Sequence, residues 1–400
     1  MSTTPAEAGR GYLDSPRGWA VVLATFVSTF VAFGLLYSFG TFFGSMSEEF
    51  GVGRGQTAFM FSLVTTIYFL LGVVAGRLGD RFGPTPLLIT AAITAFAGMY
   101  ATSKVDSIWL GYLTYGVGLG IAVSCAYVPM VAFVGGWFQR RRAAALGVAV
   151  SGIGVGTLVT APIAQTLIDS YGWRTAFVIL GAVGAVLLLG CALLAAKPPI
   201  PPSDEPVRTI AQFAADRDFV KLYACGVLLA MALFVPFVFI KDFAVGQGIP
   251  ANRAAILVGL IGGASVIGRL GIGALGGRWS VLRLTQGCFA AMTLSLLLWL
   301  FAGSSFTMLV TFTIVMGVGY GGYIALMPAL LAAIFGPAGL GGTLGLLYTS
   351  AGFGGLVGPV AIGALIDATS YPVGIVVTTV LMAMSTCALL LVDRNRAMDR

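Results

Sequence analysis

Long apolar runs, separated by short polar or Gly/Pro-containing breaks, fill most of this 400-residue chain. A helix needs about 20 mostly apolar residues to cross the hydrocarbon core of a bilayer. Twelve runs meet that length, and they cover residues 18–46, 57–76, 85–103, 107–136, 143–167, 175–196, 219–246, 254–276, 284–303, 306–334, 339–365 and 371–392. The pattern therefore predicts an all-α polytopic membrane protein with twelve transmembrane helices.

One polar connection is much longer than the others. It runs from Lys197 to Asp218 and includes Pro-Pro-Ile-Pro-Pro at 198–202, a composition typical of linkers. We expect a short surface helix within it, from Arg208 to Asp218. The chain then divides into a six-helix half at 1–196, a cytoplasmic linker at 197–218 and a six-helix half at 219–400.

An internal repeat supports two related halves. A cluster that ends at Asp169 recurs 198 residues later in a cluster that ends at Asp367. The first cluster is Gly154, Gly156, Leu158, Val159, Leu167, Ile168 and Asp169, and the second is Gly352, Gly354, Leu356, Val357, Leu365, Ile366 and Asp367. Two repeats of six helices in the same orientation fit a pseudo-twofold axis along the membrane normal, with a binding site between the halves.

Composition narrows the class of protein. Hydrophobic residues make up 58% and charged residues 9% of the chain, which excludes a soluble domain of this size. The net charge of +7 is scattered rather than gathered on one basic face, so we expect no nucleic-acid partner. Most Lys and Arg fall on alternate breaks. The positive-inside rule therefore predicts a protein of the cytoplasmic (plasma) membrane with both termini in the cytoplasm.

Several kinds of chemistry are absent from the sequence. Histidine is missing, and the five cysteines lie inside apolar runs with no CxxC pair, so we expect no metal, cofactor or catalytic residue and no enzyme activity. No cluster of acids or nucleophiles lies at membrane depth. The first apolar run is too long for a cleavable signal peptide, and we expect it to remain as the first helix.

Arg269 is the one cation in the middle of an apolar run. Counted from Ala254 at 1.5 Å per residue, it lies about 22 Å into the bilayer, where an arginine facing lipid costs at least ~2.5–3.5 kcal/mol. No acid lies well inside an apolar run as a counter-ion, and Ser265, one turn earlier, is uncharged. A planar guanidinium suits a carboxylate, so we expect Arg269 to bind a substrate anion, with Ser265 nearby. One cation favours one carboxylate over two.

Aromatic residues at similar depth are candidates for the walls of the site. A phenol can line an apolar pocket and still donate a hydrogen bond. Each of these residues could equally serve in helix packing. The candidates are Tyr37, Tyr127, Tyr320, Tyr323, Phe234 and Phe353.

Three motifs carry a resemblance to a known family. Gly76-Arg-Leu-Gly-Asp80-Arg81-Phe-Gly83, in the predicted loop after the second helix, resembles the signature loop of the major facilitator superfamily. The stretch from Trp137 to Gly152, with its basic cluster Arg140, Arg141 and Arg142, looks like the helix 4–5 signature of monocarboxylate transporters. Asp14, with Gly18 and Trp19, partly matches that family's first motif. We expect Asp80, Arg81, the three arginines and Asp14 to have gating or structural roles.

The resemblance implies the major facilitator fold and alternating-access transport of a small monocarboxylate such as lactate or pyruvate. It also implies that Arg269 is the carboxylate anchor, and on family grounds we expect proton-linked transport by a functional monomer. However, Tyr37 and Ser265 stand where relatives use a lysine and an acid for proton coupling. Two alternatives stay open: an exchanger of other organic anions, such as oxalate and formate, and an exporter of drugs or metabolites.

Overall fold

The computed structural model describes residues 13–198, 210–336 and 340–392, and these form helices and short connections with no strand. The helices are α2 (Pro16–Tyr37), α3 (Phe39–Phe50), α4 (Arg54–Phe82), α5 (Pro84–Thr102), α6 (Ile108–Gly111), α7 (Gly118–Trp137), α8 (Arg142–Leu194), α9 (Ile210–Ala215), α10 (Arg217–Gly246), α11 (Ala251–Ile267), α12 (Gly273–Leu275), α13 (Val281–Ala302), α14 (Phe306–Phe335), α15 (Leu340–Ala368) and α16 (Tyr371–Leu390). Two π-helical segments, η1 (Tyr112–Val117) and η2 (Gly268–Ile272), continue α6 into α7 and α11 into α12. The predicted all-α class is confirmed.

Eleven helical segments of the described chain are long and apolar enough to cross a membrane. One of them, α8, has 53 residues, more than twice the length that a crossing needs. It breaks at Gly172, whose φ of 77° and ψ of 160° are not helical and suit a residue without a side chain. Thr85 bonds Ala192 near one end of α8, and Trp137 bonds Ala196 just beyond it, close to where α8 begins. The two arms of α8 therefore run antiparallel, and the spans fit the predicted twelve crossings.

The predicted helix ends agree with the structure to within a few residues, except at α4. The sequence motif around Asp80 was expected in a loop, but α4 continues through it to Phe82. Gly83, with a φ of 89°, ends the helix, and Pro84 begins α5 at once. The connection is thus a single glycine, and Asp80 and Arg81 lie on the last turn of α4. Within the range of the helix expected from Arg208 to Asp218, Ile210–Ala215 form α9, residues 217 and 218 already belong to α10, and residues 208 and 209 lie outside the described part of the chain.

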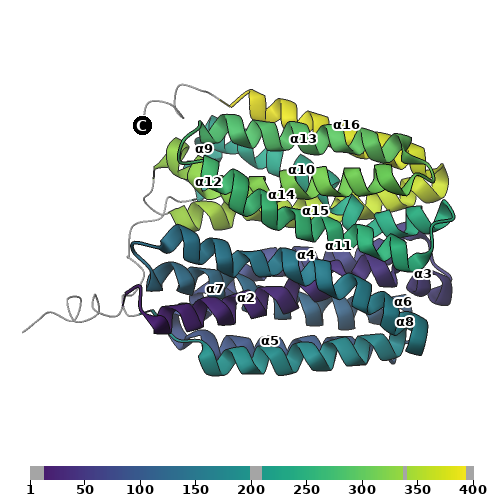
Figure 1. The fold of residues 1–400 in the computed structure, drawn as a ribbon, viewed down its shortest axis with the longest axis horizontal. Helices are drawn as coiled ribbons and strands as arrows, with labels where there is room; N and C mark the ends of the chain where they lie inside the picture. The colour runs from purple at the N-terminus through teal and green to yellow at the C-terminus, as the bar shows by residue number, and fades with distance from the viewer. Residues whose placement is uncertain (1–12, 199–209, 337–339, 393–400) are drawn as a thin grey trace, which may run out of the picture.

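The helices pack as two sets, drawn one above the other in Figure 1. Helices α2, α4, α5, α7 and α8 pack mainly against one another, as do α10, α11, α13, α14, α15 and α16. The sets meet where α4 packs on α15, α8 on α11, and α3 on α10. We call these the N-terminal and C-terminal sets, and we count α3 with the N-terminal set because it follows α2 directly and also packs on α8 and α4. The predicted domain boundaries at 196 and 218 stay a prediction.

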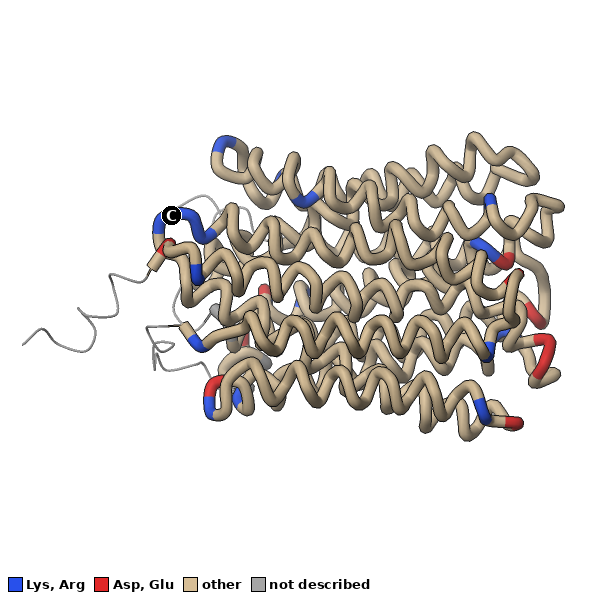
Figure 2. The backbone as a smooth tube through the Cα atoms, turned by 60° about the horizontal axis from the view of Figure 1, so that its bottom comes forward, with Lys and Arg blue, Asp and Glu red and all other residues tan. Residues whose placement is uncertain are grey.

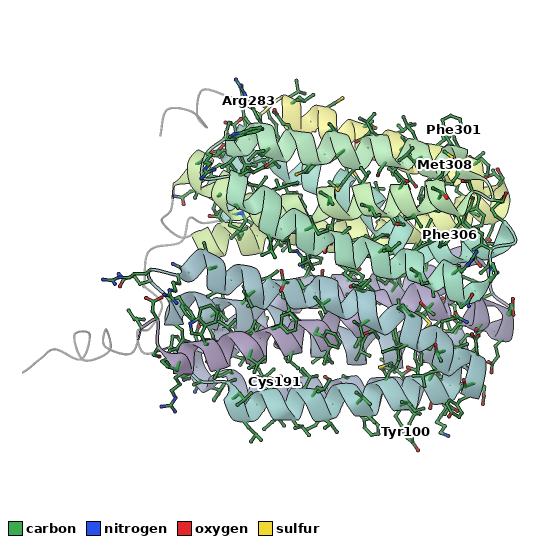
Figure 3. All side chains as sticks on the ribbon, in the orientation of Figure 1. Tyr100, Cys191, Arg283, Phe301, Phe306 and Met308 are labelled. Carbon is green, nitrogen blue, oxygen red and sulfur yellow. The ribbon has the colours of Figure 1, made fainter. Side chains whose placement is uncertain are left out.

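The surface of the bundle is apolar along its length and charged at its ends. Tyr100 and Phe301 project from the sides of the bundle, and 71% of Phe301 is exposed (Figure 3). Among the residues that the structure describes, lysines and arginines gather at the end where α2 begins and α16 ends, whereas most Asp and Glu lie at the opposite end (Figure 2). We call the first of these the termini end and the second, where α4 begins at Arg54, the Arg54 end. Apolar side chains along the flanks fit a lipid-facing surface.

Candidate functional site

A cavity of about 40 Å³ lies between the two sets, with room for about three water molecules. Its walls come from α2, α4, α7 and α8 on one side and from α10, α14 and α15 on the other. The lining residues are Phe33, Tyr37, Tyr68, Phe69, Tyr127, Ile153, Gly226, Leu229, Ala230, Leu233, Phe234, Tyr320, Tyr323, Ile324, Tyr348 and Ala351. Apart from tyrosine hydroxyls, these side chains are apolar, so the cavity suits a small molecule with a largely apolar body.

Five of the six aromatic residues expected in the site line this cavity: Tyr37, Tyr127, Tyr320, Tyr323 and Phe234. Tyr37 and Tyr320 come from opposite sets, and their hydroxyl oxygens lie 3.2 Å apart. Phe237 stacks on Tyr37, with ring centroids 4.2 Å apart, and meets Tyr320 edge to face. This aromatic cluster joins the two sets at one boundary of the cavity.

Sequence reasoning missed two further cavity tyrosines, Tyr68 on α4 and Tyr348 on α15. Their position in the middle of apolar runs was the only signal available. Their hydroxyls, with those of Tyr127 and Tyr323, make no hydrogen bond to any described residue, whereas Tyr37 and Tyr320 bond each other. Four phenols are thus available to donate to, or accept from, a bound molecule.

Arg269 is 6% exposed and is not among the residues that line the cavity, but it contacts Tyr320, which is. Its Nη1 donates to the carbonyl oxygen of Val150 on α8, at 2.9 Å, and its guanidinium carbon lies 5.6 Å from the centre of the Tyr320 ring. The two remaining nitrogens, Nε and Nη2, are buried and have no hydrogen-bond partner among the described residues. Tyr37 and Tyr348 are within electrostatic reach of the charge. No described acid forms an ion pair with Arg269.

The backbone around Arg269 is π-helical rather than α-helical, a feature frequent at functional sites. Gly268 and Gly321 bring α14 close to η2 and to the end of α11, because a Cβ on Gly268 would collide with the carbonyl of Val318, and one on Gly321 with that of Ser265. Helix α11 begins at Ala251, three residues before the predicted start. Arg269 therefore lies about 27 Å along the span rather than 22 Å.

Besides Arg269, two expected site residues are absent from the cavity lining. Ser265 is fully buried, donates to the carbonyl of Gly262 in its own helix at 2.6 Å, and does not line the cavity. It faces the tight contact of α11 with α8 and α14. The side chain of Phe353 is 52% exposed and also does not line the cavity. It belongs to an exposed stripe of α15 with Val357, Ala361 and Ala364, at helical spacing.

The motif residues near the termini end form one local cluster. Asp14, at a φ of 57°, accepts hydrogen bonds from the backbone N–H groups of Arg140 and Arg141, both at 3.2 Å. Desolvation acts to raise the pKa of Asp14, but these bonds and the charge of Arg140 outweigh it and lower the pKa. Asp14 thus fixes the chain before α2 to the turn before α8, with the side chain of Arg142 beside Gly135 of α7.

Asp80 and Arg81 make no ion pair within 4.0 Å in the described part of the chain. Instead, Lys197 donates to their carbonyl oxygens, at 3.3 and 2.8 Å, and so closes the end of α4. The gating role expected of these two residues stays a prediction. Among the described residues, no group of three or more Cys, Asp or Glu could hold a metal ion.

Comparison with protein families matches the chain to the Major Facilitator Superfamily, over residues 25–304 and 222–400. Monocarboxylate transporter 3 of Rattus norvegicus is 32% identical over 378 residues, which are 90% of this chain and 76% of the relative. Monocarboxylate transporter 4 of the same species is 30% identical, over 89% and 78%. Human Monocarboxylate transporter 11 is 29% identical, over 92% and 80%.

Solved structures resemble the fold. A bacterial homologue of the human lysosomal transporter Spinster, in an inward-facing and unoccupied conformation, superposes with a TM-score of 0.72. The superposition covers 96% of this chain and 98% of the other, at 18% identity. The same homologue in an inward-facing and occupied conformation gives 0.71, over 98% of each chain and at the same identity. At this identity the match concerns the fold alone.

Proposed function

The chain belongs to the monocarboxylate transporter family of the major facilitator superfamily and is a membrane transporter rather than an enzyme, and from this we propose that it moves small monocarboxylates such as lactate or pyruvate by alternating access. The observation that carries the proposal is the free edge of Arg269. Its Nε and Nη2 are buried and lack partners among the described residues, and its guanidinium lies against Tyr320, a residue of the cavity lining.

A carboxylate fits this edge because Nε–H and the outer Nη2–H of a guanidinium point the same way, at the spacing of two carboxylate oxygens. Because Nη1 already donates to the carbonyl oxygen of Val150, the edge formed by Nε and Nη2 is left to bind one carboxylate. The rest of the ligand would meet the rings and aliphatic side chains of the cavity. The four free phenols would bond a 2-oxo or 2-hydroxy group.

A single anchoring cation also limits the charge of the substrate. Arg269 adjoins the cavity through Tyr320, and the lining itself contains no Lys or Arg, so a second carboxylate would enter an apolar site unpaired. This supports a monoanion over a dianion such as oxalate. Val150 lies in the N-terminal set and Arg269 in the C-terminal set, so substrate at Arg269 would bind between the sets.

Binding can bias transport through charge neutralisation. An empty site holds a guanidinium whose free edge prefers water, which opposes closure of the cavity from both sides. A bound carboxylate satisfies that edge and lowers the cost of closure, so the loaded protein passes between inward- and outward-facing states more readily. The moving bodies would be the halves at 1–196 and 219–400, joined by the linker at 197–218.

We further propose proton-linked transport by a monomer, with both termini in the cytoplasm of a plasma membrane. The basic termini end supports this orientation. Support for proton linkage comes from the family alone, because the cavity lining contains no Asp or Glu. The proton would then accompany the substrate, or bind an acid outside the cavity.

Uptake of radiolabelled lactate into proteoliposomes tests the proposal. We expect saturable uptake, stimulated by an inward proton gradient and inhibited by pyruvate but not by oxalate or a cationic drug. Inhibition by oxalate would instead support an organic-anion exchanger, and inhibition by the cation alone would support a drug exporter. Lactate uptake no faster than in empty liposomes would reject the monocarboxylate proposal.

A further inference from the structure

Arg54 forms the densest polar cluster that links the two sets. Its side chain lies at the start of α4, in the N-terminal set. Nε is 3.0 Å from a carboxylate oxygen of Asp242 on α10, and Nη1 is 3.2 Å from one of Asp367 on α15. Nε also donates to the hydroxyl of Tyr371 on α16, at 3.3 Å, and the Tyr371 hydroxyl in turn donates to Asp242. One arginine thus contacts three helices of the other set.

The main chain strengthens the same link. Helix α4 begins after Gly53, whose missing side chain cannot cap the first N–H groups. The carboxylate of Asp367 performs that function from the other set, because its Oδ2 accepts the backbone N–H of Arg54 at 2.6 Å. A negative charge at a helix N-terminus is also favoured by the helix dipole.

Close packing holds these groups in place. A Cβ on Gly55 would lie 3.0 Å from the backbone nitrogen of Ala364, and one on Gly363 would lie 2.8 Å from that of Gly55. Helices α4 and α15 therefore touch through their backbones directly beside the cluster. A neighbouring contact also crosses between the sets, because the buried Lys241 of α10 donates to the carbonyl of Thr41 on α3.

Ion pairs between the sets occur only at this end, within the described residues. Arg174 pairs with Glu49 and Asp106 inside the N-terminal set, and Lys221 pairs with Asp218 inside α10. Arg54 and its partners Asp242, Asp367 and Tyr371 lie at the end of the bundle opposite the one where α2 begins and α16 ends (Figure 2). The two sets are therefore bound together on one side of the cavity.

We propose that Arg54, Asp242, Asp367 and Tyr371 form a latch that keeps the Arg54 end of the transporter shut. Opening that end must separate α4 from α10, α15 and α16, so it breaks both ion pairs and removes the cap of α4 together. The latch biases the protein towards the state that is open at the termini end. This inference rests on the proposed alternating-access function.

Distances between spin labels, measured in protein without substrate, test the latch independently of transport. One pair of labels, at Lys104→Cys and Ser304→Cys, reports on the Arg54 end from exposed positions of the two sets. A second pair, at Gln139→Cys and Arg278→Cys, reports on the termini end. The exposed native Cys387 is replaced by serine, and the other four cysteines are buried.

In Arg54→Gln we expect the long-distance population of the Lys104–Ser304 pair to rise about two- to thirtyfold relative to the short one. That range follows from the loss of two partly exposed ion pairs, each of which contributes ~0.2–1 kcal/mol. A free-energy difference of 1.4 kcal/mol changes a population ratio about tenfold. The Gln139–Arg278 pair should move towards shorter distances. The double variant with Asp242→Asn should change the ratio by less than the product of the single effects.

Arg174→Gln is the matched control, because Arg174 is exposed to a similar degree and pairs with Glu49 inside one set. It should leave both distance distributions unchanged. Unchanged distances in Arg54→Gln, or an equal shift in Arg174→Gln, would overturn the latch. If Arg54→Gln does not fold, Asp367→Asn in the same labelled background decides between the same two outcomes. A wild type that transports no lactate would reject the proposed function but leave these distances interpretable.

Discussion

The hydroxyl of Tyr37, on α2, lies 3.2 Å from the hydroxyl of Tyr320, on α14, although 283 residues separate them. The same Tyr320 places its ring 5.6 Å from the guanidinium carbon of Arg269. Tyr320 therefore contacts both the proposed substrate anchor and the opposite set of helices. Its ring and its hydroxyl have separate partners, and substitutions can remove them one at a time.

Replacing Tyr320 distinguishes these two contacts. Tyr320→Phe keeps the ring that positions Arg269 and should change the KM for lactate less than about threefold. Tyr320→Leu removes the ring, and the loss of a cation–π contact of ~0.5–2 kcal/mol should raise the KM about two- to thirtyfold. Initial rates of uptake in proteoliposomes provide both values. Equal KM values for the two variants would mean that the ring does not hold the guanidinium in a binding geometry.

Two glycines of η2 should respond differently to a methyl group. Gly268→Ala places a Cβ against the carbonyl of Val318, and overpacking of this kind costs ~1–3 kcal/mol. A Cβ on Gly271 meets nothing within 4 Å, so Gly271→Ala should change stability by less than ~0.5 kcal/mol. Thermal unfolding in detergent should show a lower Tm for Gly268→Ala alone. A similar loss in Gly271→Ala would argue against the described packing of η2 on α14.

Substitutions at Phe234 and Phe353 compare a residue that lines the cavity with one that is exposed on the outside of the bundle. Phe234 is 3% exposed and lines the cavity, whereas Phe353 is 52% exposed and does not. Phe234→Leu should alter the uptake ratio of a bulkier 2-oxo acid to pyruvate about tenfold, the usual scale for reshaping an apolar pocket. Phe353→Leu should leave the ratio unchanged. A change in the Phe353 variant alone would place the substrate on the other face of α15.

The ionisation of Asp14 makes the stability of the folded protein depend on pH. Its pKa is lowered from the usual 3.8, because bonds from backbone N–H groups outweigh desolvation. The ionised form therefore stabilises the fold above pH 3.8, and this contribution is lost as the pH falls through the lowered value. Asp14→Asn should lower the Tm at pH 7, and the difference from wild type should shrink below pH 3.8. A Tm difference that is independent of pH would exclude a role for the charge.

The places of the helices could be predicted from the sequence because apolar runs end sharply at glycine, proline and charge. Gly172, for example, breaks α8 between the predicted runs 143–167 and 175–196. The end of α4 was predicted too early because Arg77 and Asp80 read as loop residues. Polar residues are stable in the last turn of a transmembrane helix, where that turn reaches the membrane surface.

The depth of a residue was also predictable, but the direction of its side chain was not. Ser265 and Phe353 were placed in the site and Tyr348 was missed, although all three lie well inside apolar runs. In a soluble helix the polar face marks the outside, but in this protein lipid, neighbouring helices and cavity all meet apolar side chains. For Arg269 the direction was limited by the cost of a charge that faces lipid, and its guanidinium contacts Val150 and Tyr320.

The central claim is that the free edge of Arg269 binds the carboxylate of the substrate. Its most direct test is the binding of lactate to purified wild type and to Arg269→Lys, measured by calorimetry with folding confirmed by thermal unfolding. Lysine keeps the charge but not the planar fork, so we expect binding to weaken about tenfold or more, since hydrogen bonds to charged groups contribute ~1.5–3 kcal/mol. Equal affinity in a folded Arg269→Lys variant would contradict the account.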